Sequence, residues 1–194
     1  MNKILLVLMV LIALFSSSCK KQALFEQISS AHSGIHFNNL ITESDTINPL
    51  DLVNIYNGGG VGVGDFNGDG LPDLYFTGNM VASRLYLNKG DFKFEDITEK
   101  AGVIGEGRWA RGVSIVDINN DGLMDIYVCN TIYKDEKRRY NLLYINQGVQ
   151  KDGVPSFKDL SAEYGLEAGN QSTMANFFDY DNDGDLDMYL TVNS

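Results

Sequence analysis

The sequence is poor in cysteine and in positive charge, and it has no long apolar run. Its 194 residues include two Cys and 15 Lys and Arg against 26 Asp and Glu, which gives a formal net charge of −11 at pH 7. The shortage of basic residues argues against nucleic-acid binding, because no basic stripe is present to neutralise phosphates. The longest apolar run, at 4–15, has 12 residues and is too short to span a bilayer comfortably.

The start of the chain has the features of a targeting segment. Lys3 precedes the apolar run, and Ser16, Ser17 and Ser18 lead to Cys19. We therefore predict a signal peptide at 1–18. The small residues before Cys19 are similar to the bacterial lipoprotein signal, which implies a lipid on Cys19. An ordinary signal peptide and a short membrane anchor are the alternatives. All three place the mature chain outside the cytoplasm, and the lipoprotein reading places it in the bacterial envelope, anchored to the outer membrane and facing the periplasm or the surface.

The second cysteine is predicted to be structural. If Cys19 carries lipid, Cys129 has no partner and no disulfide forms. Cys129 ends the apolar run at 126–128, and free cysteines in such positions are among the most buried residues of a protein. We expect a buried thiol.

One acidic segment occurs three times, as DFNGDGLPD at 65–73, DINNDGLMD at 117–125 and DYDNDGDLD at 179–187. Each copy has Asp at its first, fifth and ninth positions, Asp or Asn at its third and Gly at its sixth. The copies begin 52 and 62 residues apart. Alternate residues of a tight turn direct side chains to one point, and Ca²⁺ takes six to eight oxygen ligands. Carboxylates that converge without a cation repel one another.

Other motifs repeat in step with the acidic loops. Phe-x-Asp-Ile-Thr at 94–98 has a counterpart at 157–161 and a looser copy at 25–29, and Leu-Tyr-Leu-Asn at 85–88 has one at 143–146. Each unit therefore predicts four short strands: one before the loop, one after it, the Leu-Tyr-Leu-Asn segment and the Phe segment. No amphipathic helix is evident, and the charged segment at 134–140 is expected to be a loop insertion.

Serial four-stranded units predict an all-β fold, a partial β-propeller with about two and a half blades. We expect an N-terminal fragment of a longer protein, in which the motif at 25–29 supplies the fourth strand of a ring-closing blade. The expected organisation is a signal peptide at 1–18, an N-terminal segment with the closing strand at 19–56, and repeats at 57–107, 108–168 and, truncated, 169–194.

Two other structures could account for the acidic loops: a plain turn and an EF-hand. A plain Asn/Asp/Gly turn leaves the ninth-position aspartates unexplained. An EF-hand needs Glu at its twelfth position, where this chain has Phe76, Val128 and Leu190, and it needs flanking helices. Mg²⁺ is disfavoured because it prefers a small octahedral site with several waters. We therefore predict about three Ca²⁺ sites, with loop three the tightest because it has the most acidic ligands. The predicted ligands, with the seventh residue of each loop acting through its carbonyl, are Asp65, Asn67, Asp69, Leu71 and Asp73; Asp117, Asn119, Asp121, Leu123 and Asp125; and Asp179, Asp181, Asp183, Asp185 and Asp187.

At these residues the chain resembles the FG-GAP, or VCBS, repeats of integrin α-like propellers. The run at 56–65, YNGGGVGVGD, and the Leu-Tyr-Leu-Asn and Phe-x-Asp-Ile-Thr segments are similar to bacterial lipoproteins that pair such a propeller with an ASPIC/UnbV domain, relatives of the cartilage acidic proteins. The resemblance implies a propeller fold and calcium binding, and it says little about function. No ASPIC/UnbV segment is present in these residues.

The leading functional hypothesis is a non-catalytic, calcium-braced binding module for an envelope or extracellular protein or a glycan, held at the membrane by lipid. The rival is a calcium-dependent polysaccharide lyase or hydrolase. Its candidate residues are His32, His36, Arg108 and Arg111, with Trp109 as a platform for sugar stacking. For each of these a structural role is the simpler expectation.

Overall fold

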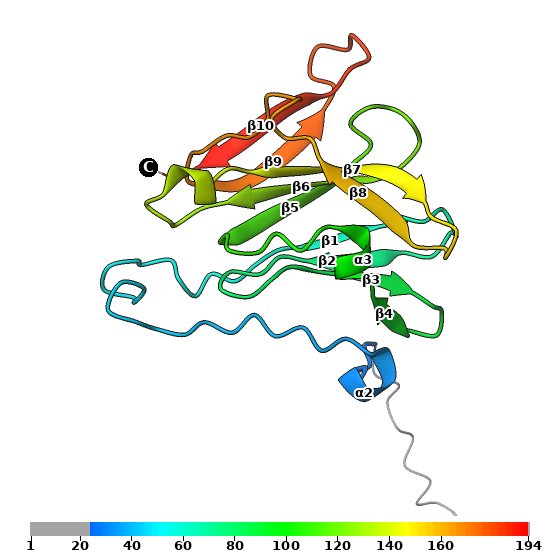
Figure 1. Ribbon diagram of the computed structural model, residues 1–194, viewed down its shortest axis with the longest axis horizontal. Coiled ribbons are helices and arrows are strands. Elements are labelled where there is room, and N and C mark those ends of the chain that lie inside the picture. Colours follow the sequence, from blue (N-terminus) through cyan, green and yellow to red (C-terminus); the bar gives the residue numbers. More distant parts are fainter. Residues whose placement is uncertain (1–23, 194) are drawn as a thin grey trace, which may run out of the picture.

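The computed structural model describes residues 24–193, so the predicted signal peptide and Cys19 lie outside the described residues. Three antiparallel sheets follow one another along the chain and stack face to face (Figure 1). The first two sheets have four strands each, in sequential order, and the third has two. This arrangement confirms the predicted all-β fold with two full propeller-like blades and the first half of another.

The strands match the predicted motifs closely. The first sheet contains β1 (Val61–Gly64), β2 (Asp73–Phe76), β3 (Arg84–Asn88) and β4 (Phe94–Asp96). The second contains β5 (Ala110–Val116), β6 (Asp125–Asn130), β7 (Leu142–Val149) and β8 (Pro155–Asp159). The third contains β9 (Ser172–Phe178) and β10 (Asp187–Val192). Short helical turns complete the structure: α2 (Ser30–Ser33), α3 (Thr98–Ala101) and the 3₁₀ turn η1 (Glu136–Arg138). None of these described helices is long and apolar enough to cross a membrane.

The middle sheet is buried on both faces because it lies between the other two. All six residues of β6 are buried. Ile126 and Val128 belong to the core shared with the first sheet, whereas Tyr127 and Cys129 belong to the core shared with the third. Among residues 24–193 the Cys129 thiol forms no disulfide, and burial raises its pKa to about 12. The prediction of a buried structural thiol is therefore confirmed.

The first strands of the three sheets approach one another very closely, and glycine makes this possible. Strand β1 packs on β5, and β5 packs on β9. A Cβ atom on Gly62 would lie 2.7 Å from Cδ1 of Ile115, and one on Gly112 would lie 2.3 Å from the carbonyl oxygen of Thr173. The glycine-rich run before loop one thus serves inter-sheet packing.

The Phe motif ends in a helical turn that a buried tyrosine fixes to the sheet. The hydroxyl of Tyr75 on β2 donates to the carbonyl of Val103, 2.9 Å away, and that of Tyr127 on β6 donates to the carbonyl of Leu166, also 2.9 Å away. Each acceptor directly follows a glycine with positive φ, Gly102 or Gly165. The same bond therefore recurs in the first two units.

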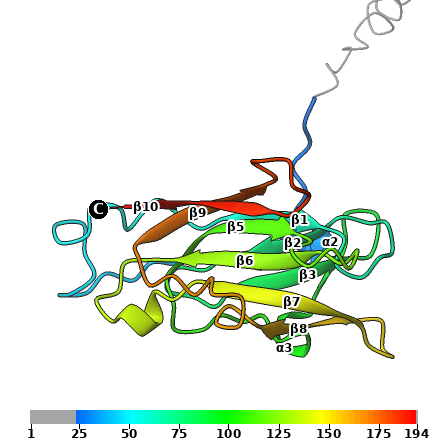
Figure 2. The same ribbon diagram turned by 90° about the horizontal axis from the view of Figure 1, so that it is seen from above.

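The ring-closing role predicted for the motif at 25–29 stays a prediction. These residues form no strand in the described chain, because a strand needs a neighbouring strand for its hydrogen bonds and none pairs with them here. The helical turn is kept: Ser29 caps α2, and Gly34 ends it with φ of 73°. Figure 2 shows the segment that contains α2 beside the first sheet.

Candidate metal centre

The three acidic loops are hairpin loops with one register. The ninth residue of each loop is the first residue of the following strand, and it pairs with the residue just before the loop: Asp73 with Gly64, Asp125 with Val116 and Asp187 with Phe178. All three loops lie on the same side of the molecule, toward the upper right in Figure 1. The repeated motif thus has a repeated position in the fold.

The first aspartate of each loop holds the backbone of the turn. In loop one, Oδ1 of Asp65 accepts from the amides of Gly68 (2.8 Å) and Asp69 (3.2 Å), and Oδ2 accepts from the amide of Gly70 (2.8 Å). Asp117 accepts from the equivalent amides of Asp121 (3.0 Å) and Gly122 (2.8 Å). In loop three, Asp179 accepts from the amides of Asp183 and Gly184, each at 3.2 Å. The turn is thereby wrapped around the first carboxylate.

Two positions of each loop have left-handed backbone conformations. The sixth-position glycines, Gly70, Gly122 and Gly184, have φ between 83° and 94°. The fourth position is left-handed as well, with φ of 75° at Gly68, 56° at Asn120 and 61° at Asn182. Gly and Asn are the residues that adopt this conformation most easily. The Gly or Asn at the fourth position is a sequence signal for this turn that the five-position motif does not include.

The ninth aspartate links the loop to the third strand of its sheet. Asp125 is fully buried; its Oδ2 accepts from the amide of Ile118 (3.1 Å) and its Oδ1 from the amide of Asn146 (2.8 Å). Asp73 makes the same pair of bonds, to the amides of Phe66 (3.0 Å) and Asn88 (2.8 Å). Burial is the largest influence on both carboxyls, and it raises the pKa of Asp73 and raises that of Asp125 to about 6.

The asparagine of the Leu-Tyr-Leu-Asn motif is part of this site, although the sequence reading did not include it. Besides its amide bond to Asp125, Asn146 donates from Nδ2 to the carbonyl of Phe66 in loop one, 2.9 Å away. Phe66 is buried between the first two sheets and meets Phe157 edge to face, with ring centroids 5.9 Å apart. Loop one is therefore tied to the neighbouring sheet as well as to its own.

The third and fifth positions differ between the loops. In loops one and two the third residue is Asn, and its Nδ2 donates to the fifth-position carboxylate, from Asn67 to Asp69 at 2.9 Å and from Asn119 to Asp121 at 2.8 Å. These amide hydrogens offset part of the negative charge. The fifth carboxylate also accepts from the amide of the seventh residue, at Leu71 (2.8 Å) and Leu123 (2.9 Å).

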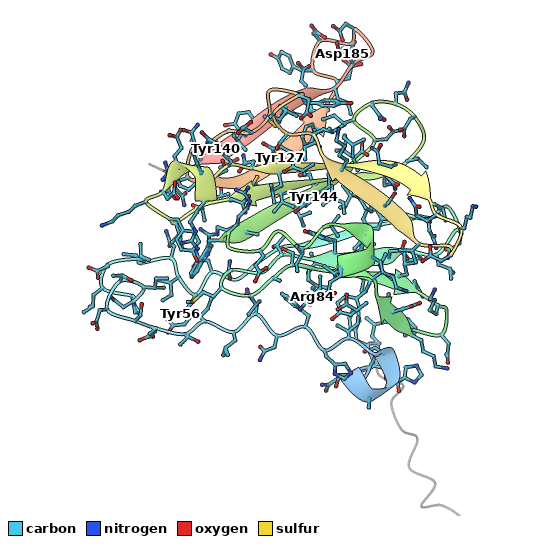
Figure 3. All side chains as sticks on the ribbon, viewed as in Figure 1. Tyr56, Arg84, Tyr127, Tyr140, Tyr144 and Asp185 are labelled. Carbon is cyan, nitrogen blue, oxygen red and sulfur yellow. The ribbon has the colours of Figure 1, made fainter. Side chains whose placement is uncertain are left out.

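Loop three brings carboxylates together without such an amide. One carboxylate oxygen from each of Asp179, Asp181 and Asp187 lies within 4.8 Å of the others. Asp183 does not join this group; it accepts from the amide of Asp185 at 3.1 Å, and its charge raises the pKa of the Asp185 side chain. Figure 3 shows Asp185 on this protruding loop. An all-oxygen donor set of this kind suits Ca²⁺, so the residues present fit the ion. The ligand assignments themselves stay predictions.

The residues proposed for an enzyme do not form one site. Trp109 has 1% of its surface exposed and cannot stack on a sugar. Arg108 donates to the carbonyls of Lys137 (2.7 Å) and Tyr140 (3.0 Å). Arg111 is half-buried beside the first strands, which lowers its pKa, and His36 is exposed.

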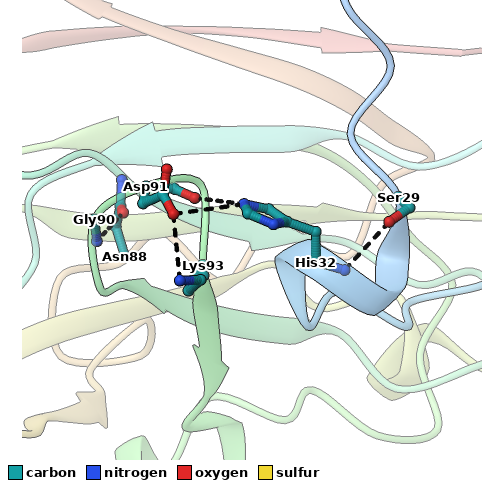
Figure 4. Close-up of polar contacts among 6 residues, drawn as sticks. All are labelled: Ser29, His32, Asn88, Gly90, Asp91 and Lys93. Carbon is teal, nitrogen blue, oxygen red and sulfur yellow. Dashed lines mark hydrogen bonds and ion pairs between the residues drawn. The ribbon is translucent and has the colours of Figure 1, made fainter.

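His32 has a structural role (Figure 4). Its Nε2 lies 2.7 Å from the carbonyl oxygen of Asp91 and 4.0 Å from the Asp91 carboxylate, which also pairs with Lys93 at 3.2 Å. Asp91 lies in the β3–β4 turn, where it and Phe92 both have positive φ. His32 therefore fastens α2 to that turn, across 59 residues of sequence.

Comparison with known proteins identifies the repeat. Residues 65–128, which include loops one and two, match the FG-GAP-like repeat family. The segment at 65–128 is therefore similar to FG-GAP-like repeats. The resemblance of the sequence motifs to this family is thereby confirmed.

The chain is also similar to cartilage acidic protein 1 from three vertebrates. It is 28% identical to the Xenopus tropicalis protein and 29% identical to the Homo sapiens protein, in both cases over 140 residues. The Mus musculus protein is 28% identical over 137 residues. These alignments cover 69–71% of this chain and 20% of each relative. The chain thus spans about a fifth of the length of these relatives.

Proposed function

We propose that this chain is a calcium-braced, non-catalytic interaction module of a bacterial envelope lipoprotein, which binds a protein or glycan partner. FG-GAP-like repeats form propeller-type interaction modules, and this part of the function follows from the family match at 65–128. Calcium bracing, the lipid anchor on Cys19, the envelope location and the absence of catalysis are the proposed parts.

The observation that carries the proposal is the position of the ninth aspartate. Asp73 and Asp125 each connect a loop to the third strand through two hydrogen bonds, and both are fully buried. Burying a carboxylate is costly unless it is paired, and a Ca²⁺ ion in the loop would supply that pairing. A bound ion would then fix the loop, the strand pair and, through Asn146, the neighbouring sheet together.

Each Ca²⁺ site would contribute a modest free energy to the stability of the fold, and in this sense calcium would act as a brace. With extracellular-type affinities of roughly 10⁻⁴–10⁻³ M, millimolar Ca²⁺ adds about 1 kcal/mol per site. Several sites in series still matter for a domain whose total stability is on the order of 5–15 kcal/mol. A rigid stack of sheets would present its connecting loops to partners.

Isothermal titration of the intact protein with Ca²⁺ and, separately, with Mg²⁺ tests the calcium part. We expect saturable Ca²⁺ binding that is reduced when Asp117, Asp121 and Asp125 are all replaced by Asn, and weak Mg²⁺ binding. Equal binding of both ions, or no change in the variant, contradicts it. Labelling of the expressed protein with a radioactive fatty acid, compared with Cys19→Ser, tests the anchor.

A further inference from the structure

A cleft with both polar and apolar walls lies at the end of the molecule away from the acidic loops. It encloses about 650 Å³ between the N-terminal segment at 45–52 and the connection between β6 and β7. Figure 3 shows this end on the left, with Tyr56 and Tyr140 labelled, and Asp185 of loop three at the upper right. The volume falls in the range of about 300–1,000 Å³ that is usual for small-molecule sites.

The wall formed by the N-terminal segment is held by one asparagine. Oδ1 of Asn48 accepts from the amides of Leu50 (3.0 Å) and Asp51 (3.1 Å), and its Nδ2 donates to Oδ2 of Asp51 (2.8 Å). Ile55, a few residues later, is fully buried and anchors the segment. Asp45 and Asp51 therefore line the cleft from a turn of fixed shape, next to the apolar side chains of Ile47 and Leu52.

The opposite wall belongs to the loop insertion that distinguishes the second repeat from the first. Ile132 has a φ of 69°, which is a strained conformation for a β-branched residue, and its amide donates to Oε1 of Gln171 at 2.6 Å. Tyr133 packs edge to face on buried Trp109, with centroids 6.3 Å apart. Strained backbone of this kind gathers at ligand sites, where the surrounding structure maintains it.

The insertion also carries a net positive charge in an acidic protein, although it includes Asp135 and Glu136. Four of the chain's 15 Lys and Arg residues lie within 134–139. Arg139 serves the loop itself, since it donates to the carbonyls of Gly169, Tyr133 and Lys134. Lys134 and Arg138 instead line the cleft, and among residues 24–193 neither lies within 4.0 Å of a carboxylate.

Arg138 is positioned for an anion. Its guanidinium carbon lies 3.2 Å from the centre of the Tyr133 ring, and its Nε donates to the carbonyl of Gly107 at 2.8 Å. Within the described chain its Nη atoms make no hydrogen bond, so two donor groups stay available. A guanidinium held flat in this way recognises a carboxylate with two parallel hydrogen bonds.

The two walls together define the ligand chemistry. Lys134 and Arg138 favour an acidic group, whereas Asp45 and Asp51 accept hydrogen bonds from hydroxyl groups and repel a second anion. Ile47 and Leu52 offer an apolar surface to the face of a sugar ring. A ligand with one carboxylate beside several neutral hydroxyls satisfies both walls, and a uniformly charged polyanion does not.

We infer that this cleft binds a glycan that contains hexuronic acid. The inference deepens the proposed interaction function by naming a site and a ligand class, and it rests on that function but not on calcium binding. The carboxylate of the uronate meets Lys134 and Arg138, and the hydroxyls of the same or the adjacent sugar meet Asp51 and Asp45.

The test is a titration of the intact, calcium-loaded protein with an oligosaccharide of alternating hexuronate and neutral sugars, measured by calorimetry. The matched ligand is the same oligosaccharide with its carboxyl groups reduced to alcohols. We expect saturable binding to the acidic form and about tenfold weaker binding to the reduced form, as for the loss of a charge-assisted hydrogen bond. Lys134→Ala and Arg138→Gln should weaken binding of the acidic form by a similar factor. Lys137→Ala, an exposed cation in the same loop but outside the cleft, should leave it unchanged.

Several results overturn the inference. Equal binding of the acidic and reduced oligosaccharides would show that Lys134 and Arg138 do not recognise a carboxylate. A glutamate-rich peptide that binds more strongly than the oligosaccharide would make the partner a protein. Asp51→Asn should weaken uronate binding; tighter binding in this variant points to a polyanion site instead. A protein that gains thermal stability with Ca²⁺ but binds no oligosaccharide at millimolar concentration refutes the cleft assignment alone, whereas failure of both refutes the proposed module.

Discussion

Asp125 allows the structural role of the loops to be separated from their predicted metal role. Its two oxygens accept from the amides of Ile118 and Asn146 inside the protein. In Asp125→Asn, one oxygen becomes an NH₂ group that faces an amide hydrogen, so one buried donor loses its acceptor. Such a loss costs about 1–3 kcal/mol. For a domain of this size, each 1 kcal/mol lowers the melting temperature by roughly 2–4 °C, so a fall of about 2–12 °C is expected without calcium.

The matched control is Asp121→Asn in the same loop. Asp121 is exposed and bonds only to groups of the turn, so we expect a change within about 0.5 kcal/mol in the absence of calcium. Both variants should lose the calcium response of loop two. Differential scanning calorimetry with a chelator and with millimolar Ca²⁺ makes the comparison. If the two variants have the same melting temperature in chelator, or if Asp125→Asn has the melting temperature of the wild type, the role assigned to the buried carboxylate is wrong.

Three further predictions concern Tyr127, Gly122 and the titration of Asp125. Tyr127→Phe removes the hydroxyl that donates to the Leu166 carbonyl and accepts from Asn141, so chemical denaturation should report a loss of about 1–3 kcal/mol; an unchanged midpoint would falsify the assigned role. Gly122→Ala has open space around the new Cβ but a φ of 85°, and the left-handed strain alone should cost about 1–2 kcal/mol, whereas Asn at this position should cost less. Burial raises the pKa of Asp125 to about 6, so in calcium-free protein its contribution to stability is present below about pH 4 and is lost as the pH rises through 6. The free energy of unfolding, plotted against pH from about 4 to 6, should therefore have a different slope in the wild type and in Asp125→Asn. Parallel plots contradict the raised pKa of Asp125.

The sequence predicted the sheets well because their signals are local. Each acidic loop and each Leu-Tyr-Leu-Asn segment marks a strand boundary within a few residues, and the strands β1 to β10 lie where those motifs place them. The repetition of the motifs then indicated stacked units. The closing strand at 25–29 stays a prediction, because its strand character depends on a neighbouring strand and none pairs with it among residues 24–193.

The parts of the site that could not be predicted depend on long-range contacts. The bond from Asn146 to Phe66 joins residues 80 positions apart, and no spacing rule connects them. The recurrence of Asn88 and Asn146 in step with the loops was a usable signal for their role. The burial of Trp109 and the approach of Tyr133 to the segment at 45–52 follow from how the insertion folds, which its charged sequence does not reveal.

The central claim is that calcium in the acidic loops stabilises the stack of sheets. The most direct measurement is amide hydrogen exchange in the intact protein with Ca²⁺ and with chelator, followed at the amides of Phe66, Ile118, Asn88 and Asn146, the partners of the ninth-position aspartates. The account predicts that calcium slows exchange at all four by about fivefold, the factor that corresponds to roughly 1 kcal/mol. It also predicts that Asp121→Asn abolishes the slowing at Ile118 and Asn146 while keeping it at Phe66 and Asn88. Exchange rates that are the same with calcium and with chelator at all four amides contradict the account.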